Sequence, residues 1–159
     1  MTCKTRIEKR VLIQASPSTV FRALTEAKGL ARWFCDHATS DPREGGELIL
    51  CWKTGKTSQK GRSVITRFEK DVRLEMLWLD EGNDRTEDSE RHVLSYAIRS
   101  RRGSTEVLMS DEDDLPQSEE DINVLSQGWN DVLMELKDYC ERTERLAKSR
   151  SGMVQEKDG

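Results

Sequence analysis

The chain of 159 residues has no long apolar segment: no run of about 18 apolar residues occurs, so we expect no membrane span. The first ten residues are polar and charged and lack the apolar stretch of a secretory signal peptide, so we expect a cytoplasmic protein. The net charge is only -4 and four tryptophans are present, which argues against a disordered chain. The length suits one domain.

Motifs that carry common chemistries are also missing. The four cysteines include no CxxC pair, and no GxGxxG, HExxH or GxSxG string occurs. Gly55-Lys56-Thr57 imitates the end of a phosphate-binding loop, but Leu50 stands where that loop needs a glycine. Cys35-Asp36-His37 would alternate between faces in an extended segment, so we interpret it as structural or as the start of a short strand. We therefore expect no cofactor, no metal and no catalytic residue.

Basic residues are absent from one stretch of the chain. Residues 103–136 carry ten acidic side chains and no lysine or arginine. The acids are densest at 111–114 and 119–121, and we interpret them as a solvated loop followed by acids at a helix N-terminus, where the helix dipole favours them. Calcium binding is the alternative, but the spacing of an EF-hand loop is missing. Such a block disfavours nucleic acid and anionic lipid on that side.

Hydrophobic periodicity predicts strands, then two short helices, then more strands. Residues 6–15 alternate as a strand, and Ser16-Pro17 begins a helix that Gly29 separates from a second short one. From Gly45-Gly46 onward the period is two, which predicts antiparallel strands. Their central residues fall at 48–52, 64–68, 74–79, 93–98 and 107–109.

A long amphipathic helix follows. Apolar residues step by three or four from Ile122 to Leu146, and Ser118 stands at a capping position, so we predict a helix over about 119–147. A helix of this length with one apolar stripe needs a large apolar partner, which the sheet provides. The predicted fold is therefore α+β: a curved antiparallel sheet of about six to seven strands around one long C-terminal helix. Residues 1–148 form a single domain in this prediction, and 149–159 form a polar, disordered tail.

Four segments, in this order, resemble the START/Bet v 1-like (SRPBCC) superfamily with its helix-grip fold. The similarity is greatest to the branch of the activator of Hsp90 ATPase homologue 1 and extends over about residues 6–142. One segment departs from that branch: residues 106–114 replace its Thr-Leu-Thr-His-like segment with an acidic run. The four segments that carry the resemblance are 11–25, 29–34, 41–46 and 128–139.

The resemblance implies a cavity between the sheet and the long helix, which would hold a hydrophobic small molecule or lipid without catalysis. Plain core packing is the alternative for the four tryptophans, whose buried indole N–H groups need partners. The residues that we expect to line the cavity are Trp33, Leu48, Leu50, Trp52, Met76, Trp78, Met109, Leu125 and Trp129.

Two other functions stay open. The branch name implies a stress-response accessory protein with a chaperone partner, although fold-level analogy does not transfer function. A cyclase- or dehydratase-like enzyme would need a buried acid or histidine in the cavity, and the candidates are Glu75 and His92. Alternation places Glu75 opposite Leu74 and Met76, on the solvent side. A homodimer through the exposed edge near the first strand is a further expectation.

Overall fold

Seven antiparallel strands form one curved sheet in the computed structural model, which describes residues 5–79, 91–114 and 117–157, with the side chains of the last helix followed as far as Ser149. The order across the sheet is β1-β7-β6-β5-β4-β3-β2. The strands are β1 (Thr5–Ile13), β2 (His37–Ser40), β3 (Glu47–Thr54), β4 (Thr57–Glu69), β5 (Arg73–Leu79), β6 (His92–Arg101) and β7 (Ser104–Asp113). The helices are α1 (Pro17–Thr25), α2 (Ala27–Trp33) and α3 (Glu119–Lys157).

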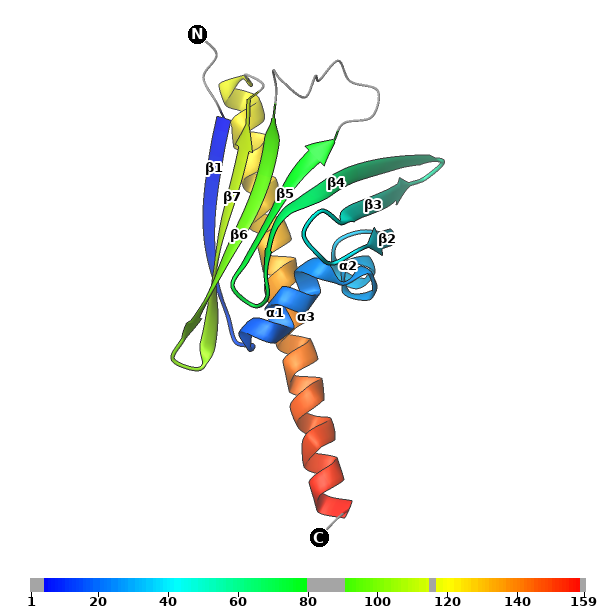
Figure 1. Ribbon diagram of the computed structural model, residues 1–159, viewed down its shortest axis with the longest axis vertical. Helices are drawn as coiled ribbons and strands as arrows, with labels where there is room; N and C mark the ends of the chain where they lie inside the picture. Colours follow the sequence, from blue (N-terminus) through cyan, green and yellow to red (C-terminus); the bar gives the residue numbers. More distant parts are fainter. Residues whose placement is uncertain (1–4, 80–90, 115–116, 158–159) are drawn as a thin grey trace.

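The sheet bends around the long helix, and the two short helices lie at one end of the space between them (Figure 1). This confirms the predicted α+β helix-grip architecture. The expected strand start at Cys35-Asp36-His37 is also confirmed, because β2 begins at His37. The segment 80–90, between the strands predicted around 74–79 and 93–98, lies outside the described residues. No helix in the described ranges is both long and apolar enough to cross a membrane.

Local sequence signals explain where the helices begin. The Ser16 side chain accepts a hydrogen bond from the Thr19 backbone N–H, and Pro17 takes the first helical position of α1. The Ser118 hydroxyl accepts from the Asp121 backbone N–H at the start of α3. Three acidic residues in the first turn of α3 suit the positive end of the helix dipole.

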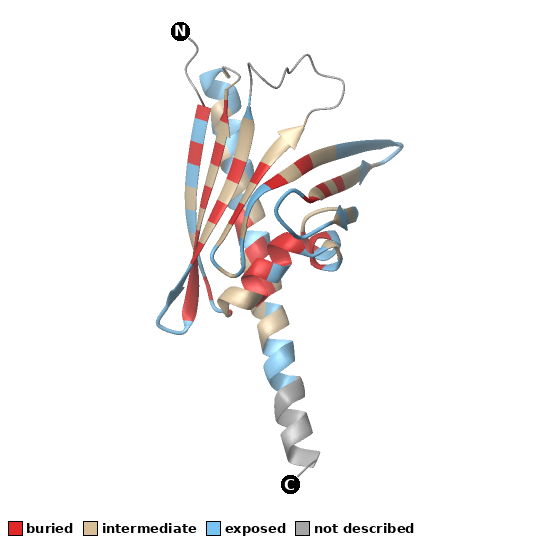
Figure 2. Ribbon diagram, viewed as in Figure 1, coloured by how far each residue is buried: buried red, intermediate tan, exposed pale blue. Residues whose placement is uncertain are grey.

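The two faces of the sheet differ in burial. On β6, Leu94, Tyr96 and Ile98 are buried and face the helices, whereas the residues between them face outward and are less buried. The same alternation produces the banded pattern on the strands in Figure 2. Glu75 lies on the outer face, between buried Leu74 and Met76, as the alternation predicts.

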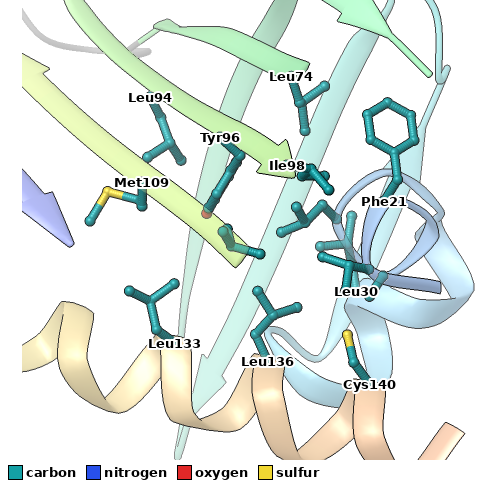
Figure 3. Packing of buried hydrophobic residues seen from close by; sticks show 14 of the residues in the cluster. Phe21, Leu30, Leu74, Leu94, Tyr96, Ile98, Met109, Leu133, Leu136 and Cys140 are labelled. Carbon is teal, nitrogen blue, oxygen red and sulfur yellow. The ribbon is translucent and has the colours of Figure 1, made fainter. Parts of the chain in front are cut away.

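The middle of α3 supplies the helix side of the core. Leu133, Leu136 and Cys140 are buried and point toward the sheet and the short helices (Figure 3). Burial raises the pKa of the Cys140 thiol to about 12, so this cysteine stays protonated. The predicted stripe is thus partly wrong: Leu133 and Cys140 join it, and Leu146 is 55% exposed. The helix α3 extends past the end of the sheet, which therefore offers no apolar partner to this part of the helix (Figure 1).

The structure differs from the prediction at the C-terminal end as well. The helix α3 ends at Lys157, past the predicted end near residue 147 and within the segment 149–159. An uninterrupted run without proline permits this continuation. Because side chains are described only as far as Ser149, the prediction that this segment is a separate tail stays a prediction.

Two glutamates anchor α3 to the corner between β1 and α1. The Glu141 carboxylate accepts from the Gln14 backbone N–H at 2.9 Å and pairs with Lys137. The Glu144 carboxylate accepts from the Thr19 hydroxyl at 2.6 Å and from the Ser16 backbone N–H at 3.3 Å. The stretch 133–144 of α3 is therefore held by buried side chains and by charge-assisted hydrogen bonds.

The anchor at Glu141 predicts a pH-dependent contribution to stability. Hydrogen bonds from Lys137 and from the Gln14 backbone hold the pKa of the Glu141 carboxyl below its usual value. A lowered folded-state pKa stabilises the fold above the unfolded-state pKa, and this stabilisation is lost as the pH falls through the folded-state value. Glu141→Gln should therefore lower the free energy of unfolding by about 0.5–1.5 kcal/mol at pH 7.

Urea unfolding at a series of pH values measures this effect. The difference between the wild type and Glu141→Gln should shrink as the pH falls below about 4.5, the ordinary value for the group. Glu135→Gln, at an exposed position of the same helix, is the matched control and should change little. A difference between the wild type and Glu141→Gln that stays constant down to low pH would show that the carboxylate is not the anchor.

Candidate functional site

Five of the nine expected cavity residues meet around one small central cavity. Its volume is about 10 Å³, roughly the space that one water molecule needs. Trp33 comes from α2, Leu48 and Leu50 come from β3, and Met76 and Trp78 come from β5. Aliphatic and aromatic side chains of α1, α2 and β6 complete its wall, and these are Leu24, Leu30, Phe34, Leu94 and Tyr96.

Two of the indoles at this end have hydrogen-bond partners. The Trp33 indole donates to the Ala23 carbonyl at 2.8 Å, and the Trp52 indole donates to the Phe34 carbonyl at 2.7 Å. Trp33 and Phe34 are stacked, and Phe34 meets Trp52 edge to face. This end of the interior is thus a well-packed aromatic cluster, in which Trp33 ties α2 to α1 and Trp52 ties the end of α2 to β3.

A second pocket, of about 110 Å³, opens between the sheet and the first half of α3. Leu125 of α3, another of the expected residues, forms part of its wall and is 38% exposed. The pocket has an apolar side and a polar side, because buried carboxylates and a histidine face it from β6 and β7. Its remaining lining residues are Thr5, Ile7, His92, Asp111, Asp113 and Gln117.

Asp111 is the centre of the polar side. Its carboxylate lies 2.5 Å from His92 Nε2 through one oxygen and accepts from the Trp129 indole at 2.8 Å through the other. The Asp111 side chain is only 9% exposed. Trp129, which we expected to line the cavity, is the one side chain of the first half of α3 with a described hydrogen bond to the sheet.

The acidic block is thus not the solvated loop that we predicted. The strand β7 runs to Asp113, so Asp111 and Asp113 continue the inner-face series of Val107 and Met109 and are buried. Alternation along β7 continues past the last apolar residue, and the carboxylates are buried because they face polar partners. Only the acids at 119–121 lie at a helix N-terminus, as predicted.

Tyr96 lies next to this polar group inside the core. It is 3% exposed, and its hydroxyl forms no hydrogen bond with any residue in the described part of the chain. The hydroxyl points toward α3, close to Met109 and Leu133 (Figure 3). Burial, and secondly the Asp111 carboxylate, raise the pKa of Tyr96 far above its ordinary value, so the side chain remains a neutral phenol.

A larger hollow lies elsewhere, on the outer face of the sheet. Its volume is about 650 Å³, and its floor is formed by small side chains such as Ser95, Ala97 and Ser110. Charged side chains of both signs surround it, including the pair of Arg6 with Glu112. It is shallow and polar, and none of the expected site residues except Met109 contributes to it.

In the segment Cys35-Asp36-His37 the described side-chain contacts go to backbone groups, and Asp36 accepts from the Lys53 backbone N–H. Burial raises the pKa of the Cys35 thiol, and its sulfur donates to the His37 carbonyl at 3.1 Å. A raised thiol pKa lowers nucleophilicity at neutral pH. No group of three histidine, cysteine, aspartate or glutamate residues is arranged to hold a metal among residues whose positions are described.

The comparisons with known proteins agree with this architecture. The family model for Activator of Hsp90 ATPase homolog 1-like protein matches residues 14–141. Among solved structures, a protein from Cytophaga hutchinsonii has a TM-score of 0.74 at 18% identity, covering 90% of this chain and 98% of its own. A Mesorhizobium loti protein has a TM-score of 0.72 at 16% identity, covering 87% and 98%.

A third structure, the solution structure of the Aha1 dimer from Colwellia psychrerythraea, has a TM-score of 0.71 at 18% identity and covers 86% and 96% of the two chains. No curated protein matches this sequence. The structural neighbours support the fold, and the family model covers most of the domain. The chain therefore belongs to the Activator of Hsp90 ATPase homolog 1-like family.

Proposed function

We propose that this protein binds a hydrophobic small molecule between the sheet and the first half of α3, without catalysis. The observation that carries the proposal is the unequal packing of α3. Residues 133–144 of α3 include its buried side chains and its anchoring glutamates, whereas Leu125 is 38% exposed at the edge of a pocket on the sheet side. Such a partly covered apolar site with a few polar groups is typical of small-molecule sites.

The pocket is small for a lipid, so binding requires the first half of α3 to move. In the described residues this half is tied to the sheet by one side-chain hydrogen bond, from Trp129 to Asp111. Breaking such a bond costs about 0.5–1.5 kcal/mol net. Burying a leucine-sized apolar group contributes about 1.5–3 kcal/mol, so an apolar ligand can offset the cost of opening.

A pair of tryptophan substitutions on α3 tests this proposal. Leu125→Trp should fill the pocket and raise the dissociation constant of the neutral apolar dye N-phenyl-1-naphthylamine at least tenfold, about 1.4 kcal/mol. Val124→Trp is the matched control because Val124 is 67% exposed on the neighbouring face of the helix. Dye fluorescence measures both constants.

Val124→Trp should leave the constant within about twofold of the wild-type value. If the wild-type protein does not bind the dye, or if the two variants affect binding equally, the proposed site is wrong. Native mass spectrometry of freshly purified protein, followed by lipid extraction, would then identify any apolar molecule that co-purifies.

A second proposal rests on the family. The family description names an activator of Hsp90 ATPase, and the Colwellia psychrerythraea relative is a dimer. We propose as the alternative a chaperone partner, and with it a homodimer in the cytoplasm. A pull-down that recovers Hsp90, with an increase in its ATPase rate on addition of this protein, would support the alternative. Light scattering during size-exclusion chromatography would test the dimer.

An enzymatic function of the cyclase or dehydratase kind is the third alternative. Such an enzyme needs a buried acid or histidine inside the site. Asp111 is a buried acid there, and it pairs with His92. Their hydrogen bond to each other and the indole on Asp111 give them a binding role in the first proposal. Turnover of a bound ligand, followed by mass spectrometry, would favour the enzyme.

A further inference from the structure

The polar side of the pocket between the sheet and α3 indicates which kind of ligand head group fits there. Asp111 and Asp113 are both buried there, on the inner face of β7. Each carboxylate oxygen has two acceptor positions, and each oxygen of Asp111 has one described partner. Asp111 therefore retains capacity to accept hydrogen bonds from a ligand.

A second, independent feature is the hydroxyl of Tyr96. It is buried, has no described hydrogen-bond partner and points toward α3, near Met109 and Leu133 (Figure 3), and its side chain lines the small central cavity. In the sheet register Tyr96 faces Met109, and Leu94 faces Asp111, so Tyr96 and Asp111 are diagonal neighbours on adjacent strands. Diagonal neighbours lie about 7–8 Å apart, within reach of one polar group placed between them.

The surrounding charge favours a cation over an anion. Residues 103–136, which include β7 and the start of α3, carry no lysine or arginine. Arg6 lies on the outer face, where it pairs with Glu8 and Glu112. Lys9, which faces Met109 from β1 and is a diagonal neighbour of Asp111, is the nearest basic residue of β1 on the inner face, and it forms no ion pair with the described part of the chain.

Resting on the function proposed above, we infer that the bound molecule is an amphiphilic amine, with its ammonium group between Asp111 and Tyr96 and its apolar part against Ile7 and Leu125. An ammonium group has three N–H donors. These suit the open acceptor positions of Asp111 and the oxygen of the Tyr96 hydroxyl. A carboxylate head group would meet two buried carboxylates instead, and like charges at close range are unfavourable.

Three ligands with the same chain and different head groups test the inference. Octylamine, octanol and octanoate compete with N-phenyl-1-naphthylamine at pH 7, where the amine is cationic and the acid anionic. Octylamine should displace the dye at a concentration at least tenfold lower than octanoate, with octanol between them. Equal potency of octylamine and octanoate, or a preference for octanoate, would overturn the inference and indicate Lys9 as the head-group partner.

Matched variants separate a local contact from the overall negative charge. Asp111→Asn should reduce the preference for octylamine over octanoate to less than about threefold. Glu112→Gln removes the same charge from the next residue, which faces outward, and should preserve the preference. If the two variants reduce the preference equally, the head group does not contact Asp111, and the inference fails.

A further variant keeps the test valid if Asp111→Asn does not fold. Tyr96→Phe removes one hydroxyl that has no described partner, so it should fold as the wild type does and weaken octylamine several-fold more than octanol. An equal effect on both ligands would contradict the proposed head-group position. Dye binding separates the two proposals. If the dye does not bind, the proposed site is wrong, whereas dye binding without a preference for octylamine overturns only the inference that the ligand is an amine.

Discussion

Replacing Leu136 by alanine is expected to lower the free energy of unfolding by about 2–5 kcal/mol. Leu136 is completely buried on α3 and packs toward the sheet and the short helices (Figure 3). Removing its side chain loses apolar burial and leaves a cavity between α3 and the sheet. Urea unfolding followed by circular dichroism measures the change.

Met134→Ala is the matched control for this prediction. Met134 lies two residues away on the same helix but is 52% exposed, so its truncation should change stability by less than about 0.5 kcal/mol. The slope of the free energy against urea should be unchanged in both variants, since both keep the same fold. Similar losses for Leu136→Ala and Met134→Ala would mean that this face of α3 does not grip the sheet.

A second large effect is expected at Gly46, in the turn before β3. A Cβ atom at this position would overlap the Asp41 carbonyl oxygen. The backbone there cannot shift freely, because Gly46 donates to the Arg43 carbonyl and accepts from the Ile65 N–H. Gly46→Ala should therefore destabilise by about 1–3 kcal/mol, the cost typical of overpacking.

Gly128→Ala serves as the contrasting substitution. Gly128 lies within α3, and a Cβ there would contact nothing within 4 Å. Alanine should stabilise the helix by about 0.5–1 kcal/mol, because glycine loses more backbone entropy on folding. Thermal unfolding of both variants should give shifts of opposite sign. A loss of stability for Gly128→Ala would indicate a close contact at this glycine that the structure does not show.

Much of the fold was predictable because the responsible signals are local. Ser16-Pro17 and Ser118 mark helix starts by hydrogen bonding to nearby backbone, which needs no knowledge of the remaining chain. Alternation identified the inner residues of β3 and β5, and four of them meet Trp33 of α2 around one cavity. The helix stripe was predicted less well, because the burial of Leu133 and Cys140 depends on how the sheet curves around α3.

The polar part of the site could not be predicted in the same way. Asp111 looked like one more member of an acidic run, and its burial depends on His92 and Trp129, which are far away in the sequence. Tyr96 was missed although its alternation with Ser95 and Ala97 placed it inward beside Leu94 and Ile98. That alternation was the available signal, and continuing it along β7 would have placed Asp111 inward as well.

The most direct test of the account is hydrogen exchange of the α3 backbone with and without N-phenyl-1-naphthylamine. Amide exchange should be fast over residues 119–130 in the free protein and slow over 133–144, where the helix is buried and anchored. Adding the dye should slow exchange in 119–130 and in the facing parts of β6 and β7. Unchanged exchange in α3 while the dye binds would place the ligand elsewhere and contradict the account.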